Sequence, residues 1–168
     1  MSKEKRISLE TLEREYNSTR KYHSATLKNG EVIRYYAKFS ETKIEKLLQE
    51  LYEMVLVDEK LEEPLFNEDG KLIKFSYFLV IKYFTDLGKS FPDGYENSLL
   101  LFNKMIELDL FSEIINDVLP IEESGKVYER IIEKYQLVDN MLANQRAVEE
   151  LAELKAQERE LQLLQEKK

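Results

Sequence analysis

The stretch KLIKFSYFLVIKYFTDL, from Lys71 to Leu87, decides the fold class of this chain of 168 residues. Apolar residues occupy nearly every side of a helix drawn through it, and a helix that is apolar all round must be covered by other elements. Gly88 follows it in the position where helices commonly end on glycine. The stretch therefore predicts the central helix of a bundle. Core packing is the favoured role of its aromatic cluster from Phe75 to Phe84, and a groove for a client helix or strand is the alternative.

Amphipathic helices are predicted on both sides of this central helix. Ser40 precedes a segment whose apolar residues recur at the helical spacing of three and four. These residues are Ile44, Leu47, Leu48, Leu51, Tyr52, Val55 and Leu56. A further helix is expected over about Tyr95 to Glu107, with inward residues Leu99, Leu100, Phe102, Met105 and Ile106. Asp109 is expected to cap a short helix through Val118, and Pro120 sits at another helix start. The pattern indicates a mainly α protein, a compact helical bundle.

The N-terminal part is different. Ser8 can cap a short helix in which Leu9, Leu12 and Tyr16 share one face. Two extended runs then flank Asn29-Gly30, the pair that most favours a type I′ turn, in which both central residues take positive φ. The runs are Ala25 to Lys28 and Glu31 to Ala37. An N-terminal β-hairpin is therefore expected. Because an isolated hairpin is marginal in water, it should lie on the helical body or extend another sheet.

The chain changes character near Asn144, where a Glu/Gln/Leu/Lys tail begins. We divide it into residues 1–39 with the hairpin, a helical body over 40–143, and a polar helical tail over 144–168, expected as a long C-terminal helix extending from the body. The tail keeps a thin apolar stripe, which makes it a candidate partner-binding segment. Its members in that role are Val148, Leu151, Leu154 and Leu161. Glu158 interrupts the heptad pattern and weakens a coiled-coil interpretation.

Charge and composition narrow the classes of partner. The net charge is -8, so the averaged surface repels nucleic acid and anionic membranes. Cys is absent, which excludes disulfides and thiolate sites. The charged N-terminus is not followed by an apolar segment, so we expect no secretory signal and a cytoplasmic location. The apolar stretch ending at Leu87 is interrupted by polar residues and shorter than the roughly 18 residues of a membrane span.

No pattern points to catalysis, a metal or a cofactor. His23 is the single histidine and has no cysteine partners, which makes a poor metal site. Acidic pairs such as Glu122-Glu123 fall at turns or helix starts, where they favour the helix dipole. The glycines form no phosphate-binding loop. Tyr35 and Tyr36 on the hairpin are candidate partner-binding residues instead. Neighbouring strand residues point to opposite faces, so one of these rings should be exposed.

Several segments of the body resemble the small helical tail assembly chaperones of long-tailed phages and prophages of Gram-positive bacteria. The segments are Tyr83-Phe84-Thr85-Asp86-Leu87, Phe91-Pro92-Asp93-Gly94-Tyr95, Asp109-Leu110-Phe111-Ser112-Glu113-Ile114-Ile115, and Leu119-Pro120 to Val127-Tyr128. The resemblance is one of texture and element order and carries no catalytic signature. It implies a non-enzymatic protein of the bacterial host cytoplasm that binds the tape measure protein, recruits the tail tube protein and self-associates.

In that family a programmed ribosomal slip near the end of the coding sequence appends a second domain to a fraction of the copies. Gln165 to Lys168 can be encoded by A-rich codons on which such a slip would occur. The N-terminal hairpin departs from a purely helical family, although an edge strand can serve in oligomer contact. The alternative function, of a different class, is a structural or regulatory phage adaptor such as a scaffold, a neck component or an inhibitor of a host protein.

Overall fold

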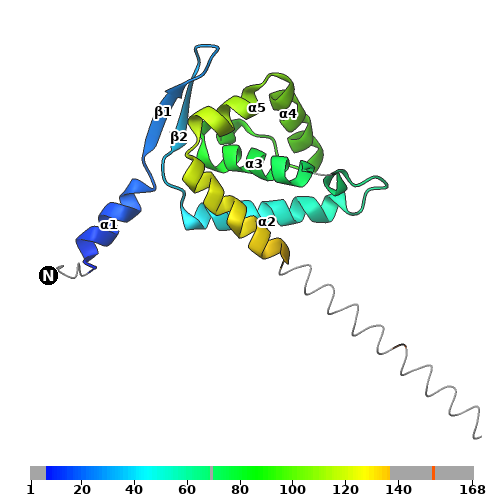
Figure 1. Cartoon of the computed structure of the whole chain (residues 1–168), viewed down its shortest axis with the longest axis horizontal. Helices are drawn as coiled ribbons and strands as arrows, with labels where there is room; N and C mark the ends of the chain where they lie inside the picture. The colour runs from blue at the N-terminus through cyan, green and yellow to red at the C-terminus, as the bar shows by residue number, and fades with distance from the viewer. Residues whose placement is uncertain (1–6, 69, 137–152, 154–168) are drawn as a thin grey trace, which may run out of the picture. The chain divides into compact units, whose positions relative to one another are not determined.

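The computed structural model describes residues 7–68, 70–136 and 153, and it confirms a mainly α protein with an N-terminal hairpin (Figure 1). The elements, in order, are α1 Leu9–Ser18, β1 Tyr22–Thr26, β2 Val32–Tyr36, α2 Glu41–Asp58, the short helix η1 Leu65–Asn67, α3 Lys71–Phe84, η2 Asp86–Ser90, α4 Tyr95–Glu107, α5 Leu110–Glu113 and the π-helix η3 Ile114–Val118. A last helix covers 121–136.

By packing, the chain divides into residues 1–128 and 129–168. In the second unit, residues 129–136 and Glu153 are helical. The division predicted from the sequence, with boundaries after residues 39 and 143, stays a prediction.

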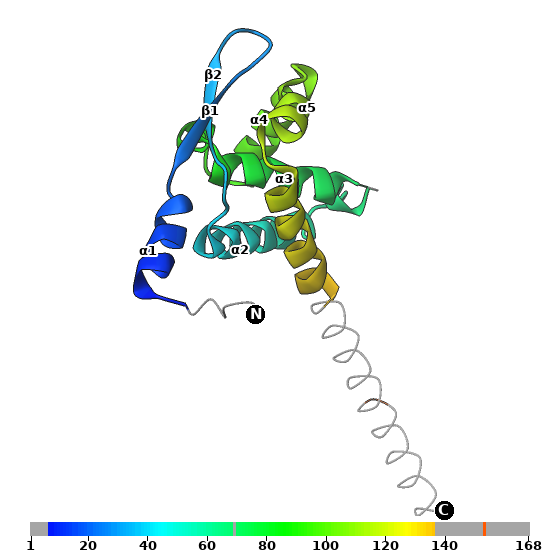
Figure 2. The same ribbon diagram turned by 60° about the vertical axis from the view of Figure 1, so that its left-hand side comes forward.

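Helix α3 is the centre of the first unit, as predicted. Its aromatic residues Phe75, Phe78 and Phe84 are fully buried, and α2 packs along it (Figure 2). The ring of Phe75 lies 5.3 Å from that of Phe78 and 5.6 Å from that of Phe102 on α4, centroid to centroid. Aromatic pairs at these distances add to the free energy gained by burial. The phenylalanines of the cluster are therefore core, as predicted, whereas Tyr77 and Tyr83 are half-buried, and a client-binding role for these two rings stays a prediction.

The end of α3 differs from the prediction. The helix stops at Phe84 because Thr85 is extended, with φ -127° and ψ 166°, and pairs with Tyr35 of the hairpin. Gly88 lies inside η2 and has no role as a helix cap. A Cβ at Gly88 would lie 1.7 Å from the carbonyl oxygen of Lys82, so this turn requires a residue without a side chain. Docking of a distant strand thus ends the helix one turn early.

The hairpin forms, but its turn is of another type. Strand pairing runs from Tyr22 with Tyr36 to Thr26 with Val32. Gly30 has φ 86°, whereas Asn29 does not take positive φ, so the two-residue type I′ turn is wrong. The backbone N–H of Gly30 donates to Leu27 and that of Leu27 to Glu31, which makes a three-residue loop with glycine in the left-handed position.

The inward faces of α2 and α4 are partly as predicted. Ile44, Leu47, Leu48, Leu51, Phe102 and Met105 are buried. Tyr52, Leu56, Leu100 and Ile106 were expected inside and are exposed. These helices are covered along one narrow stripe, so apolar residues at its borders stay in water. Ser40 and Asp109 occupy N-cap positions, but neither side chain makes a capping hydrogen bond.

Candidate protein-interaction surface

An open apolar surface of the described chain lies on α1. Ser8 begins the helix, since its Oγ accepts a hydrogen bond from the backbone N–H of Thr11 at 3.2 Å. The following apolar residues, spaced by three and four, share one face as predicted. They are Leu9, 80% exposed, Leu12, 54% exposed, and Tyr16, 59% exposed. No residue of α1 is buried, so this helix contributes its apolar side to no core in the described structure.

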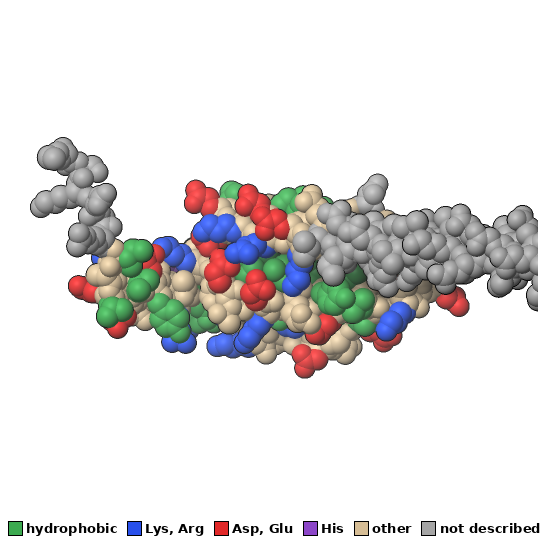
Figure 3. Space-filling model, turned by 90° about the horizontal axis from the view of Figure 1, so that it is seen from below, with side chains coloured by type: hydrophobic (Ala, Val, Ile, Leu, Met, Phe, Trp, Pro, Cys, Tyr) green, Lys and Arg blue, Asp and Glu red, His purple; other side chains and the backbone are tan. Residues whose placement is uncertain are grey.

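We call Ile7, Leu9, Leu12 and Tyr16 the α1 face. Ile7 directly precedes the capping serine and is also largely exposed. Figure 3 shows hydrophobic side chains gathered over α1 at the left of the described surface. Scattered apolar side chains are normal on a protein surface, whereas a contiguous group marks an interaction site. The α1 face therefore has the character of a docking surface for another protein segment.

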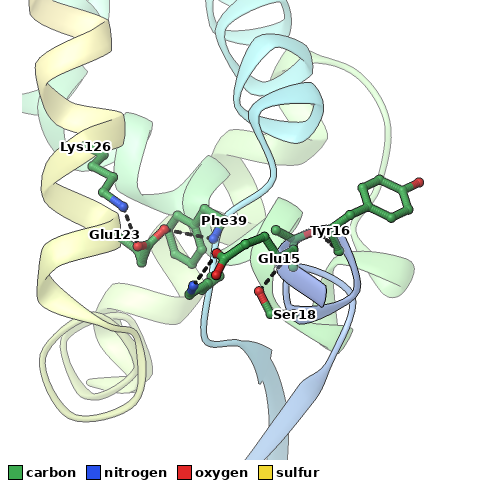
Figure 4. Close-up of polar contacts among 8 residues, drawn as sticks. Glu15, Tyr16, Ser18, Phe39, Glu123 and Lys126 are labelled. Carbon is green, nitrogen blue, oxygen red and sulfur yellow. Dashed lines mark hydrogen bonds and ion pairs between the residues drawn. The ribbon is translucent and has the colours of Figure 1, made fainter. Parts of the chain in front are cut away.

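The link between α1 and the helical body leaves this face open. Lys38 Nζ lies 3.2 Å from Glu15 Oε2, in an ion pair whose two side chains are both more than half exposed. Figure 4 shows the Tyr16 ring pointing away from this contact. At the end of the helix, the guanidinium of Arg20 lies 5.0 Å from the centroid of that ring. Exposed ion pairs contribute about 0–1 kcal/mol, so α1 is held weakly.

The hairpin, in contrast, is held by side-chain carboxylates of the body that accept hydrogen bonds from its backbone. Arg34 N–H donates to Asp86 Oδ1 at 2.9 Å, and Lys28 N–H donates to Glu113 Oε1 at 2.6 Å. Hydrogen bonds to ionised acceptors are the stronger kind. The hairpin is thus fixed to η2 at its middle and to α5 at its loop.

A third carboxylate holds the segment that follows the hairpin. Phe39 N–H donates to Glu123 Oε2 at 2.9 Å, and Lys126 Nζ donates to the other oxygen of Glu123 at 2.6 Å (Figure 4). The hydrogen bond from Lys126 to Glu123, together with the charge of that carboxylate, raises the pKa of Lys126. The ring of Phe39 stacks on that of Phe84 at 3.7 Å between centroids. This combination of a buried ring and a bonded amide anchors the chain where it enters α2.

The two candidate tyrosines of the hairpin are both half-buried, so the expectation of one exposed ring is wrong. Tyr36 is covered by Tyr22, with ring centroids 4.2 Å apart, and by Lys43, whose Nζ lies 3.7 Å from the ring centroid. The backbone of Tyr35 forms a β-bridge with Thr85, and its ring lies 5.8 Å from that of His23. Their role in partner binding stays a prediction. The other candidates, Val148, Leu151, Leu154 and Leu161, lie outside the described residues.

Ionisation of the tyrosine pair is coupled to its neighbours. The hydrogen bond with Tyr36, together with burial, raises the pKa of Tyr22 to about 12. Burial of Tyr36 acts against its ionisation, but hydrogen bonds from Tyr22 and Lys43 lower its pKa overall. The first proton to leave the pair is therefore that of Tyr36, beside the ammonium group.

A groove of about 590 Å³ lies between α2, α3 and the start of α4. Its central charged residues are already paired: Lys82 Nζ and the hydroxyl of Tyr83 each donate to one oxygen of Glu50, both at 2.6 Å. Burial, then the hydrogen bond to Glu50, raises the pKa of Tyr83. The ion pair is largely buried, and each partner satisfies the other. This arrangement joins α2 to α3, and the role of Lys82, Tyr83 and Glu50 in it is structural.

His23 lies on exposed strand β1, with its ring 5.8 Å from that of Tyr35. Among the described residues, no three His, Asp or Glu side chains gather in a way that could hold a metal ion. No described helix combines the length and apolarity needed to cross a membrane.

Sequence reasoning places Leu9, Leu12 and Tyr16 on one face but does not identify that face as a candidate site. The available signal is a ten-residue helix, too short to be stable alone, separated from the bundle by a hairpin. The helical spacing does not identify Ile7 as part of this face, because Ile7 lies before the N-cap residue Ser8. The carboxylates that hold the hairpin could not be found, because each pairs with a backbone group more than 50 residues away.

Comparison with known proteins gives one family. The family model described as YomO matches residues 8–165, nearly the whole chain. No curated protein and no solved structure matches significantly.

Proposed function

The chain belongs to the YomO family, a phage-related family, and from this premise we propose that it is a non-enzymatic tail assembly chaperone that binds the tape measure protein and assists assembly of the tail tube. The observation that carries the proposal is the α1 face, an apolar helix surface that is used for no core within the described residues. Tail assembly takes place in the cytoplasm of the bacterial host, where we expect the protein to act.

The α1 face fits an elongated helical client. Two helices pack side by side through apolar residues spaced by three and four, which is the spacing of Leu9, Leu12 and Tyr16. A contact of this size is small compared with the 1,200–2,000 Å² or so of a stable interface. Binding by one copy is therefore weak and reversible, whereas copies that also associate with one another along one long client gain avidity. A chaperone that must leave the finished tail needs this combination.

Charge around the α1 face indicates which client helix it prefers. Glu13 lies four residues after Leu9 and three before Tyr16, at the border of the face, and the protein has a net charge of -8. Arg20 covers the far end, over Tyr16. A client helix with Lys or Arg beside its apolar stripe is therefore favoured. Binding should weaken as salt rises, because the charges that assist it are exposed.

The test is co-expression with the tape measure protein of the same phage, followed by co-purification. We expect the full chain to keep the tape measure protein soluble and to purify with it. The double variant Leu9→Gln/Leu12→Gln should reduce the recovered tape measure protein about tenfold or more, since it removes two apolar side chains from the contact. Its fold should be unchanged, since no residue of α1 is buried. The matched control is Leu100→Gln/Leu108→Gln, which makes the same chemical change at two exposed leucines of the body.

The proposal fails if the wild-type protein neither binds nor solubilises the tape measure protein. Retention of the protein in purified mature virions would favour the structural adaptor instead. The ribosomal slip is checked separately, from the nucleotides that encode Gln165 to Lys168 and the reading frame that follows.

A further inference from the structure

The outer edge of β1 is an open hydrogen-bonding edge. In the described chain the sheet has two strands, β1 and β2. The bond from Leu27 N–H to Glu31 closes the loop as a hydrogen-bonded pair, and such pairs alternate along an antiparallel ladder. The pairs of Ala25 and His23 with β2 are then also hydrogen-bonded. Tyr22, Ser24 and Thr26 direct their backbone groups to the other side.

The same alternation is visible on β2, where it can be checked. Arg34, the partner of Ser24, must direct its N–H away from β1, and this N–H donates to Asp86. The backbones of Tyr22 and Tyr36 form a non-hydrogen-bonded pair of the ladder. Side chains approach closely in such a pair, and the two rings are stacked. The outer edge of β2 is thus used by the body, while that of β1 faces solvent, with Tyr22, Ser24 and Thr26 exposed.

The open edge lacks the features that keep edge strands apart. Natural edge strands carry Lys, Pro or a bulge that blocks pairing with another chain. The sequence of β1, YHSAT, has no Lys, Arg, Asp, Glu or Pro, in a protein of which 35% is charged. Two copies with a net charge of -8 repel each other, so they can approach best where the surface is neutral. A neutral edge on an acidic protein therefore suits a second copy of the same chain.

We propose that β1 pairs antiparallel with β1 of a second copy, across a two-fold axis at Ser24, to form a four-stranded sheet. The strand selects this register. Its three open residues are symmetric about Ser24, so Ser24 meets Ser24 of the second copy and Tyr22 meets Thr26 at each end. Every residue in these pairs exchanges both backbone hydrogen bonds with its partner. A shift in either direction leaves at least one open residue without a partner strand residue.

The pairing has a structural consequence for each hairpin. A two-stranded sheet is marginal alone, whereas four strands protect the inner two on both edges. The contact is small, so the dimer should depend on protein concentration. This pairing goes beyond the proposed binding of a client and does not depend on it.

The test places charges at the two-fold axis. In Ser24→Lys two ammonium groups face each other across the axis, and in Ser24→Glu two carboxylates do. By sedimentation velocity of the full chain, Ser24→Lys alone should dimerise about tenfold more weakly than the wild type, or worse, because like charges directly opposite each other destabilise a strand pair. Ser24→Glu alone should also dimerise more weakly, but by a smaller factor, because each carboxylate faces Arg34 of its own hairpin as well. An equimolar mixture of the two variants should recover the dimer, because an ammonium group then faces a carboxylate across the axis. This recovery also shows that both variants are folded.

The matched control is Thr26→Lys. It adds the same charge on the same side of the strand, but the new side chain meets Tyr22 of the second copy and not itself, so dimerisation should be kept. A wild-type protein that stays monomeric at all concentrations overturns the proposal. So does a dimer that both Ser24 variants leave intact, or one that the Leu9→Gln/Leu12→Gln variant dissociates, since the contact would then be the α1 face.

Discussion

The hydroxyl of Tyr95, the first residue of α4, donates a hydrogen bond to the carboxylate of Asp58, the last residue of α2. Asp58 is 1% exposed and also accepts from the backbone N–H groups of Leu65 at 2.9 Å and Phe66 at 3.0 Å. One buried carboxylate therefore joins the end of α2, the short helix η1 and the start of α4. Burial of Tyr95, then its hydrogen bond to Asp58, raises its pKa.

Replacing Asp58 should destabilise the protein strongly. Asp58→Ala leaves two part-buried amides and one buried hydroxyl without an acceptor, and a buried group left in this way costs about 1–3 kcal/mol. We expect the free energy of unfolding to fall by about 3 kcal/mol or more, measured by urea denaturation. Tyr95→Phe removes one donor and should cost about 1.5 kcal/mol. Equal losses in the two variants would show that the backbone bonds to Asp58 contribute nothing.

The two glycines 88 and 125 should respond oppositely to alanine. In Gly88→Ala the new Cβ would overlap the carbonyl oxygen of Lys82, so the backbone must shift, and we expect a loss of about 3 kcal/mol. Gly125 lies in a helix, and an added Cβ there would have no neighbour within 4 Å, so Gly125→Ala should gain about 0.5–1 kcal/mol. Thermal unfolding of both variants checks the pair. A stable Gly88→Ala protein would mean that η2 is not tightly packed on α3.

Removing a hairpin anchor should loosen a single amide. In Asp86→Ala the N–H of Arg34 loses its acceptor, so its hydrogen exchange should accelerate about tenfold, while amides buried in α3 stay protected. Exchange measured by NMR resolves this residue. The control is Asp117→Ala, at an exposed acidic residue of η3, which should leave the exchange of Arg34 unchanged.

Stability should fall at alkaline pH partly through Tyr22. Its pKa of about 12 in the folded protein lies above the value of about 10 in an unfolded chain, so the unfolded chain releases this proton first. The stability that depends on the protonated Tyr22 is complete below about pH 10 and is lost as pH rises toward 12. Tyr22→Phe should lose less stability over that interval in urea denaturation. An identical alkaline loss in the variant would exclude this contribution.

Lys43 should control the other tyrosine of the pair. Because the ammonium group favours the ionised form of Tyr36, Lys43→Met should raise the pKa of Tyr36. Less tyrosinate absorbance, at about 295 nm, is then expected near pH 10 in the variant than in the wild type, since that is about the ordinary pKa of tyrosine. As a control for folding, the far-UV circular dichroism of Lys43→Met at neutral pH should be the same as that of the wild type.

Local patterns are sufficient for most of the helices. The bounds of α4, Tyr95 to Glu107, follow from a turn before it and the spacing within it, and Ser8 fixes the start of α1. The end of α3 could not be predicted, since Thr85 leaves the helix to pair with Tyr35, 50 residues earlier in the chain. The sequence alone places Asp58 in an acidic exit from α2, because nothing local shows that two amides and a hydroxyl surround it.

The α1 face is also only partly predictable, because local patterns show its residues but not what covers them. The shared face of Leu9, Leu12 and Tyr16 is a property of one helix and is visible in the sequence. Whether that face is covered depends on the rest of the fold. The surroundings of Tyr35 and Tyr36 likewise depend on other parts of the chain, since Thr85 pairs with the backbone of Tyr35 and Lys43 lies over the ring of Tyr36.

The three carboxylates that hold the hairpin and the segment after it also set an order of events during synthesis. Each of these backbone N–H groups is synthesised well before the carboxylate that accepts its hydrogen bond. The acceptor of Arg34 is Asp86, 52 residues later, that of Phe39 is Glu123, 84 residues later, and that of Lys28 is Glu113, 85 residues later. The hairpin leaves the ribosome before any of its acceptors exists, and bringing such distant groups together is slow. The first part of the chain to be made is therefore among the last to be fixed in place, and a nascent chain stopped before Asp86 exposes a strand edge with nothing to hold it.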